Sequence, residues 1–289
     1  MVTDETRMGG VSKPDIRENP CSSAAKISSE KCSYPALAAL RIGCVQYLNS
    51  KPLIHGYDGP VVFDHPSGLA RDLVAGKLDV ALVPIFEALR HPHYALAEDV
   101  AIACDGPVYS VFLAHRGPLV EVRRIALDPA SLTSVHLLQV LLREFHGLHP
   151  ELLEVSAYPE RADAVLLIGN QAIDFRDQDR GAHQIFDLGA EWQRCTGLPF
   201  VFAPWLLRPG LENARAIADA LRALKVEGLA RIDEIVSAEL RDPAFTRRYL
   251  TEHIRFVLGE REKAGIERYR DLLAKHGFIT DAKTPLRYV

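Results

Sequence analysis

Apolar and polar residues follow one another along the chain in blocks typical of strands that lead into helices. From Arg41 the sequence reads "RIGCVQYLNSKPL", a short apolar run followed by polar side chains and a proline. The apolar run predicts a strand, and Pro52 is tolerated in the first turn of a helix, so we expect a helix to begin near Asn49 or Ser50. Amide groups at such a helix start point out of the strand's carboxyl end, where they stabilise an anion.

The same pattern recurs further along. "VVFD" is followed by "PSGLARDLVAGKL", where we expect Ser67 to cap a helix that ends at Gly76. "DVALVPIFEAL", residues 79–89, is almost continuously apolar and predicts a strand buried on both faces of a parallel sheet. A second set begins with "RIALDPASLTSVHLLQVLLREFHG", in which Ser131 is the expected helix cap, and continues with "AVLLIGNQAI", a strand that ends in a glycine turn at Gly169.

Two long apolar segments, 107–115 and 199–207, join these sets and predict strands that cross between two lobes. We therefore predict an α/β protein with two lobes around a central cleft. The expected boundaries are a disordered tail over 1–37, a first lobe over 38–112 and 206–289 with C-terminal helices that cover it, and a second lobe over 113–205. Small-molecule sites favour domain interfaces and the carboxyl ends of parallel strands, so the strand-to-helix turns are expected to open into the cleft.

Composition narrows the choice of function. The 289 residues carry a formal net charge of -4, and no Lys/Arg-rich block occurs, so binding to nucleic acid is disfavoured. The five cysteines are scattered without C-x-x-C spacing, which indicates neither a zinc site nor a disulfide framework. No run of about 18 apolar residues is present, and the first 36 residues lack a secretory apolar run, so we expect a cytoplasmic protein that does not span a membrane.

Several of these segments, together with "VQYLNSKPL", "GPVYSVFLAH" and "DLGAEWQRCTGLPFVFAPW", resemble the chorismate dehydratase (MqnA) family of the futalosine route to menaquinone. The resemblance runs from about Leu40 to the C-terminus. It implies a fold similar to type II periplasmic binding proteins, used by a cytoplasmic enzyme without metal or organic cofactor. It also implies chorismate as substrate and 3-[(1-carboxyvinyl)oxy]benzoate and water as products. We expect a monomer or a homodimer.

The resemblance also implies which turns face the substrate. The residues are Tyr47, Asn49, Ser67, Ser110, Thr133, Ser134, Gly169 and Asn170. Two positions depart from the family pattern: Leu132 stands where the family often has arginine, and Asn170 where it often has aspartate. The first removes a cation that would hold a carboxylate, and the second removes a negative charge, so the two changes could compensate electrostatically.

These residues lead to a hypothesis about their roles. Ser131 to Ser134 and the helix start behind them bind a substrate carboxylate, while Asn49 and Ser110 are catalytic and face the reacting ring. Asn49 would donate a hydrogen bond and not act as a base, because an amide does not titrate usefully. The turns hold no histidine or carboxylate, so the substrate's own side-chain carboxylate would take the proton.

Other candidates have a structural interpretation that is stronger. We expect Glu87 to be a solvated carboxylate at a strand end, and His55 and His136 to be hydrogen-bonded structural histidines. His91 and His93 have an H-x-H spacing, but without nearby ligands a loop is expected and no metal site. Four aromatic residues could line a wall for the substrate ring, although a core position is expected for most of them: Tyr109, Trp192, Phe200 and Trp205.

Two alternative functions stay open at this stage. The fold is mostly used by solute-binding proteins that capture an aromatic or dicarboxylate ligand unchanged. The related 1,4-dihydroxy-6-naphthoate synthase shares the fold, but it begins with a Ser-Pro-Cys-Pro-Asn-Asp type of motif. The chain has Gln46-Tyr47-Leu48-Asn49 at that place, which favours the dehydratase.

Overall fold

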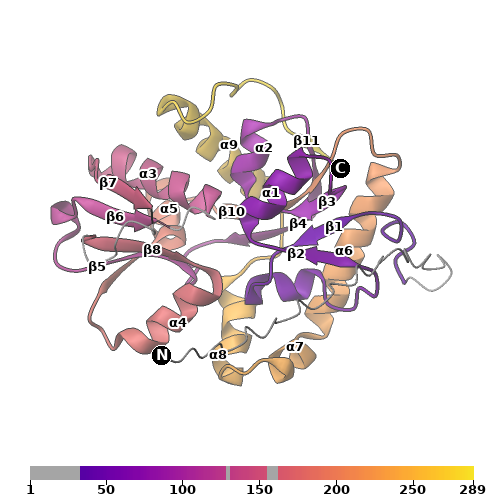
Figure 1. The fold of residues 1–289 in the computed structure, drawn as a ribbon, viewed down its shortest axis with the longest axis horizontal. Coiled ribbons are helices and arrows are strands. Elements are labelled where there is room, and N and C mark those ends of the chain that lie inside the picture. The colour runs from indigo at the N-terminus through magenta and orange to yellow at the C-terminus, as the bar shows by residue number, and fades with distance from the viewer. Residues whose placement is uncertain (1–32, 128–130, 155–161) are drawn as a thin grey trace, which may run out of the picture. The chain divides into compact units, whose positions relative to one another are not determined.

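The computed structural model describes residues 33–127, 131–154 and 162–289, which form two mixed β-sheets with helices packed on them (Figure 1). The first sheet has the strand order β11-β4-β10-β3-β1-β2, and the second has the order β7-β6-β8-β5-β9. The first contains β1 (Ile42–Cys44), β2 (Val61–Phe63), β3 (Val80–Leu82), β4 (Ala95–Cys104), β10 (Phe200–Leu207) and β11 (Arg287–Tyr288). The second contains β5 (Val111–His115), β6 (Arg124–Leu127), β7 (Glu151–Glu154), β8 (Ala164–Ile168) and β9 (Gln184–Asp187). The predicted α/β class is confirmed.

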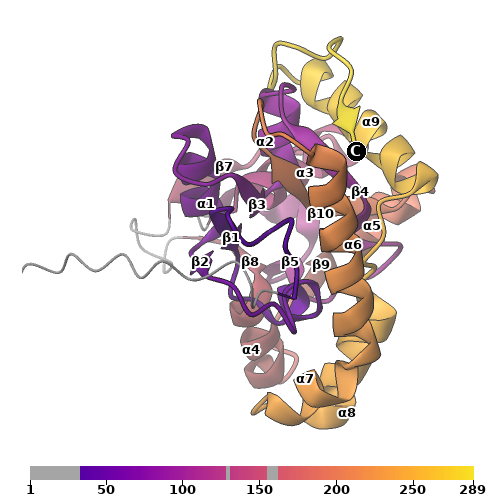
Figure 2. The same cartoon turned by 90° about the vertical axis from the view of Figure 1, so that its right-hand side faces the viewer.

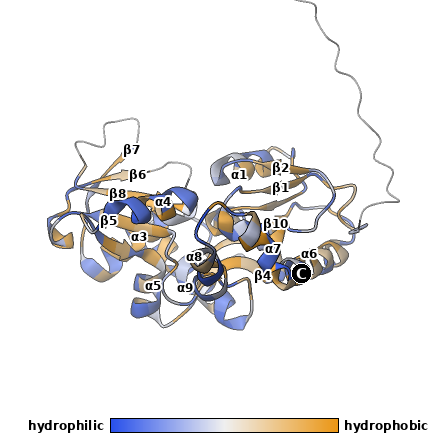
Figure 3. Cartoon of the chain, turned by 90° about the horizontal axis from the view of Figure 1, so that it is seen from below, coloured by the Kyte–Doolittle hydropathy of each residue, from blue (hydrophilic) through white to orange (hydrophobic). Residues whose placement is uncertain are grey.

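Helices follow the strands in chain order and cover the sheets. The strands are largely apolar, whereas the helices carry polar residues as well, as the hydropathy colouring shows (Figure 3). The helices are the 3₁₀ turns η2 (Leu48–Leu53) and η3 (Leu119–Glu121), α1 (Pro66–Val74), α2 (Ile85–Arg90), α3 (Leu132–His146), α4 (Gly169–Asp179), α5 (Leu188–Thr196), α6 (Ala214–Ala230), α7 (Ile232–Ala238), α8 (Pro243–Arg248), the π-helical turn η5 (Tyr249–His253) and α9 (Glu260–Lys275).

The chain passes between the sheets twice. It leaves the first sheet after β4 and enters the second at β5, and it returns after α5 to β10, which pairs antiparallel with both β4 and β3. The C-terminal helices do not cover one lobe alone, because α6 packs on β4 and η2 while α9 packs on β10 and on α3 (Figure 2 shows α6 from the side). The residue boundaries expected for the lobes stay a prediction.

Three expectations about local structure differ from the structure. Residues 79–89 do not form one strand: β3 ends at Leu82 and α2 begins at Ile85, because Pro84 cannot donate to a sheet ladder and instead precedes the helix. Ser67 does not cap α1, since Pro66 takes the first helical position and His65 is the N-cap.

The third difference concerns the tail. Residues 33–37 belong to the folded part, because Tyr34 and Leu37 are buried in the core. Apolar side chains in a polar leader were too few to be recognised as core by their pattern. The rest of the expected tail, 1–32, lies outside the described residues.

A glycine in α6 brings this helix against the backbone of η2. A Cβ atom added to Gly228 would lie 2.0 Å from the carbonyl oxygen of Pro52. A real Cβ never approaches a backbone atom so closely, so the position of η2 depends on the missing side chain. Because η2 carries Asn49, helix α6 helps to place a residue of the predicted site.

We expect Gly228→Ala to destabilise the protein by about 1–3 kcal/mol, although alanine normally favours a helix interior by about 1 kcal/mol. The reason is that a backbone carbonyl cannot move aside. Gly68→Ala in α1 is the matched control, because its added Cβ would also meet an atom at 2.0 Å, but that atom belongs to the flexible Asp64 carboxylate. Urea unfolding of both variants measures the difference, and equal stabilities would contradict the proposed packing constraint.

Candidate active site

A cavity of about 560 Å³, including the part open to solvent, lies between residues of the two sheets. Six of the nine residues predicted to form the site line it: Tyr47, Asn49, Ser131, Thr133, Ser134 and Gly169. They come from three separate turns, which follow β1, β6 and β8 in the chain.

The first wall is the η2 turn. Its N-cap is Tyr47 in an extended conformation, and Ser50 donates its hydroxyl to the Val45 carbonyl at 2.6 Å, which closes the turn on the end of β1. Asn49 is 8% exposed, and its Oδ1 atom has no hydrogen-bond partner among the described residues. A buried amide oxygen without a partner is costly, and such groups are concentrated at functional sites. Ser50 therefore has a structural role, whereas Asn49 is available for a ligand.

The second wall is the start of α3. Ser131 is the N-cap, as expected, but its side chain makes no capping hydrogen bond. Ser131 and Ser134 are both buried, and both line the cavity. The free amides at the start of a 15-residue helix add a positive dipole end. Neutral donors and a helix dipole together suit a carboxylate.

Thr133 is held differently from its two serine neighbours. Its Oγ1 atom accepts a hydrogen bond from the Phe86 amide at 3.2 Å, and its carbonyl accepts one from the Tyr269 hydroxyl at 3.2 Å. The first bond ties α3 to α2, and the second ties α3 to α9. Thr133 lines the cavity, but its main hydrogen bonds fix the helix start in place.

The third wall is the glycine turn after β8. Gly169 has a left-handed φ of 58°, and an added Cβ would lie 2.8 Å from the ring of Tyr47. Only glycine fits this contact. Asn170 points elsewhere: its Oδ1 accepts from the Leu48 amide at 3.0 Å, so it links α4 to η2 and is not among the residues that line the cavity. An aspartate at position 170, which the family often has, would also offer a side-chain oxygen to the Leu48 amide. Asn170 therefore changes the charge at this position but keeps the contact.

Two other predicted residues do not line the cavity. Ser67 lies in the first turn of α1 and is half-buried, while its neighbour Pro66 contacts the cavity. Ser110 is fully buried, and its Oγ accepts a hydrogen bond from the Tyr249 hydroxyl at 2.7 Å. Tyr249 lies 139 residues further along the chain. The sequence pattern does not indicate Tyr249 as a partner of Ser110, because an aromatic residue in a helical segment is usually part of the core.

The rest of the lining is apolar. Phe202 of β10 lines the cavity as a second aromatic residue besides Tyr47, together with Leu82, Ile102 and Leu132. Trp192 and Phe200 instead pack against Tyr269 in the core, which is the position expected for most of the four aromatic candidates. Alternation along β10 places Phe200 and Phe202 on one face, so the sequence pattern alone could not distinguish the residue that lines the cavity from the one in the core.

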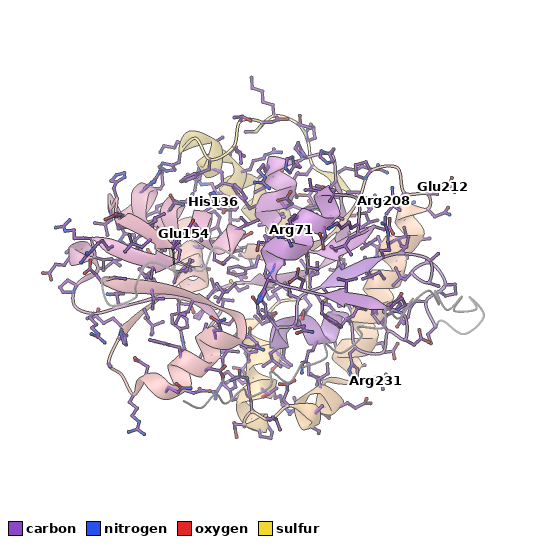
Figure 4. All side chains as sticks on the ribbon, in the orientation of Figure 1. Arg71, His136, Glu154, Arg208, Glu212 and Arg231 are labelled. Carbon is purple, nitrogen blue, oxygen red and sulfur yellow. The ribbon has the colours of Figure 1, made fainter. Side chains whose placement is uncertain are left out.

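No aspartate, glutamate, histidine, lysine or arginine is among the described residues that line the cavity. The expectation for Glu87 was wrong: it is fully buried on α2, where Arg90 pairs with it at 2.8 Å, because the predicted strand end is a helix. His136 lies on α3 and Arg71 on α1 (Figure 4). The His136 ring stacks on Phe86 with centroids 3.7 Å apart, and burial lowers its pKa, so its structural interpretation holds.

Among the described residues, the structure shows neither a candidate metal site nor a membrane-spanning helix. Within residues 33–127, 131–154 and 162–289, no group of three or more His, Cys, Asp or Glu side chains is arranged to hold a metal ion. In the same residues, no helix combines the length and the apolar character needed to cross a membrane.

Comparison with known proteins identifies relatives over most of the chain. The model of a family described as menaquinone biosynthesis matches residues 40–275. A chorismate dehydratase from Thermus thermophilus is 34% identical over 263 residues, which cover 80% of this chain and 94% of that protein. A chorismate dehydratase from Campylobacter jejuni is 27% identical over 246 residues, which cover 83% of this chain and 94% of that protein.

Solved structures show the same architecture. The periplasmic aliphatic sulphonate binding protein SsuA from Escherichia coli superimposes with a TM-score of 0.58 at 13% identity, covering 85% of this chain and 89% of that one. The expected two-lobed fold of the periplasmic-binding-protein type is therefore confirmed. Since the family model spans most of the sequence and the Thermus relative is similar over nearly its full length, the chain belongs to the menaquinone biosynthesis family.

Proposed function

We propose that this chain is an enzyme, a chorismate dehydratase, which converts chorismate to 3-[(1-carboxyvinyl)oxy]benzoate and water. The observation that carries the proposal is a cavity lined by neutral hydrogen-bonding groups at a helix start, in a chain related to two chorismate dehydratases. The reaction is a carbon–oxygen lyase reaction. It removes the hydrogen at the carbon that bears the enolpyruvyl ether and expels the neighbouring hydroxyl, and the ring becomes aromatic.

The start of α3 suits one carboxylate of the substrate. The hydroxyls of Ser131 and Ser134 and the first amides of the helix would donate to it. A hydrogen bond to a charged group contributes about 1.5–3 kcal/mol, and the helix start adds about 0.3–1 kcal/mol. A few such contacts reach micromolar affinity, about 8 kcal/mol, without the cation that Leu132 replaces.

Asn49 is the residue that we propose to face the reacting ring. Asn49 lines the cavity from the η2 turn, and an N–H there would stabilise the oxygen that leaves as water. No titratable side chain among the described lining residues competes for the role of base. We therefore keep the proposal that the substrate's own side-chain carboxylate removes the proton. Apolar neighbours such as Phe202 and Ile102 would contact the ring and exclude water.

The proposed function is tested by incubating the purified protein with chorismate and following the product by ultraviolet absorbance and mass. Loss of one water with a benzoate spectrum supports the dehydratase. Tight binding with chorismate recovered intact would instead indicate a solute-binding protein, the function of the SsuA relative in fold. The expected cytoplasmic location and the monomeric or homodimeric state stay predictions.

Replacing Asn49 with alanine is expected to lower kcat by at least about a hundredfold while chorismate still binds, because the lost contact matters most in the transition state. Turnover is measured by product absorbance and binding by calorimetry. Thermal unfolding checks that the variant is folded. Turnover within a factor of a few of the unmodified protein would remove Asn49 from the mechanism.

Ser134→Ala should act on binding. We expect KM to rise about tenfold with little change in kcat, because a ground-state contact to a carboxylate is lost. The matched control is Ser237→Ala, since the Ser237 hydroxyl is exposed and donates to the Asp233 carbonyl of its own helix. An unchanged KM in Ser134→Ala would place the carboxylate elsewhere.

A further inference from the structure

The carboxylate of Asp187 joins two parts of the second sheet that lie far apart in the sequence. Asp187 ends β9 and is the N-cap of α5, and its side chain is 9% exposed. Its Oδ1 atom accepts from the Gly189 and Ala190 amides, both at 3.0 Å, which is an ordinary helix cap. A cap of this kind needs one oxygen, so it leaves Oδ2 for other partners.

Further donors come from the segment that crosses from β4 to β5. The Val108 amide donates to Oδ1 of Asp187 at 3.1 Å, and the Tyr109 amide donates to Oδ2 at 2.8 Å. Tyr109 has a φ of 68°, an uncommon left-handed conformation for a residue other than glycine. Such a conformation persists only where neighbouring contacts enforce it, and the bond to Oδ2 is one of these contacts.

Arg176 on α4 constrains the same place. Its Nη2 atom donates to Asp187 Oδ2 at 3.4 Å. Its guanidinium carbon lies 4.2 Å from the ring centroid of Tyr109 and 4.7 Å from that of Phe112, within the range of cation–π contacts. The Tyr109 ring also contacts Phe245, with centroids 5.1 Å apart. Oδ2 of Asp187 therefore belongs to a cluster that fixes both the backbone and the ring of Tyr109.

The crossing segment forms part of the cavity wall. Val108 and Val111 both line the cavity. Between them, Ser110 donates its N–H to the Val108 carbonyl at 2.8 Å, and its carbonyl accepts from the Gly169 amide, also at 2.8 Å. Gly169 is itself a lining residue. A change in the backbone of Tyr109 would therefore move an apolar part of the lining and loosen the glycine turn.

We propose that Asp187 is a positioning residue for the dehydration, which sets this wall by holding the amides of Val108 and Tyr109. The inference rests on the proposed function for its catalytic consequence. The two carboxylate oxygens have separate roles: Oδ1 caps α5 and holds Val108, whereas Oδ2 fixes the left-handed Tyr109. Sequence pattern alone accounts for the aspartate of "DLGAEWQRCTGLPFVFAPW" as a helix cap, because the donors in the crossing segment lie 79 and 78 residues earlier.

Asp187→Asn separates the two roles. The amide oxygen of asparagine can still cap α5, but its NH₂ group then faces the Tyr109 N–H and the Arg176 guanidinium, which are donors as well. We expect kcat to fall about tenfold with KM within about threefold, because the proposed carboxylate site lies on α3, at another wall of the cavity. Thermal unfolding checks that the variant is folded.

The backbone of the crossing segment gives a second readout. Val108-Tyr109 is the one Val-Tyr pair in the sequence, and Tyr109-Ser110 is the one Tyr-Ser pair. Carbonyl ¹³C in the first residue of each pair and ¹⁵N in the second therefore select a single amide signal. Charge-assisted hydrogen bonds are short and strong, so the Tyr109 amide proton should move upfield in Asp187→Asn as the bond to Oδ2 is lost. The Ser110 amide signal should move with it.

Asp163→Ala is the matched control. Asp163 also accepts from the amides of two consecutive residues, Arg123 and Arg124, at 3.0 and 2.9 Å, but it is not among the described residues that line the proposed active site. Its loss should lower the thermal stability and leave kcat and the Tyr109 signal unchanged. If Asp187→Asn fails to fold, Arg176→Met replaces it in both readouts, because it removes the charge that contacts Oδ2 and the Tyr109 ring.

The outcomes are distinct. An unmoved Tyr109 signal, or a kcat within about twofold of the unmodified protein, would overturn the positioning role. An equal loss of kcat in Asp163→Ala would overturn it too, since kcat would then follow stability and not the crossing segment. An unmodified protein that leaves chorismate unchanged would refute the proposed function, and the Tyr109 and Ser110 signals would then decide whether Asp187 sets this backbone.

Discussion

The contact between the glycine turn after β8 and the turn after β1 is the constraint on which the cavity depends. Gly169 lies directly against the ring of Tyr47, and Asn170 accepts the Leu48 amide. These contacts join elements that follow strands of different sheets, so they set the distance between the walls that carry Asn49 and Ser131. A side chain at Gly169 would push the walls apart, and the groups on them would no longer reach one small molecule.

The polar groups at this cavity are neutral, and this has physical consequences. Burying a cation or a carboxylate costs several kcal/mol unless it is paired, whereas hydroxyls and helix amides need less compensation when no ligand is bound. A site of this kind can be dry and still bind an anion, because the donors gain strength in a low dielectric. A dianionic substrate would then bring the charge, and with the α3 start engaged by one carboxylate, the other stays free to act on the substrate itself.

Local motifs predicted the walls of the cavity well, and long-range contacts could not be predicted. Polarity after an apolar strand identified Asn49, Ser131 and Gly169, because the carboxyl ends of strands meet at one edge of a sheet. Ser110 was expected in the same place, yet its direction depends on Tyr249 and on Asp187, each more than 70 residues away. The expectation that Glu87 is a solvated residue at a strand end was wrong for a local reason, since Pro84 ends the apolar strand and begins a helix.

The positions of Tyr109 and Tyr249 explain why unusual backbone geometry occurs on both sides of one hydrogen bond. A left-handed residue before Ser110 and a π-helical turn at Tyr249 are each less favourable than regular structure, and each persists only where surrounding contacts enforce it. Here the enforcing contacts are the Asp187 carboxylate and the aromatic stack on Phe245. Regular geometry at either residue would move one hydroxyl of the pair, and the hydrogen bond between Tyr249 and Ser110 would be lost. The strain is therefore localised where the hydroxyls of two residues from distant parts of the chain meet.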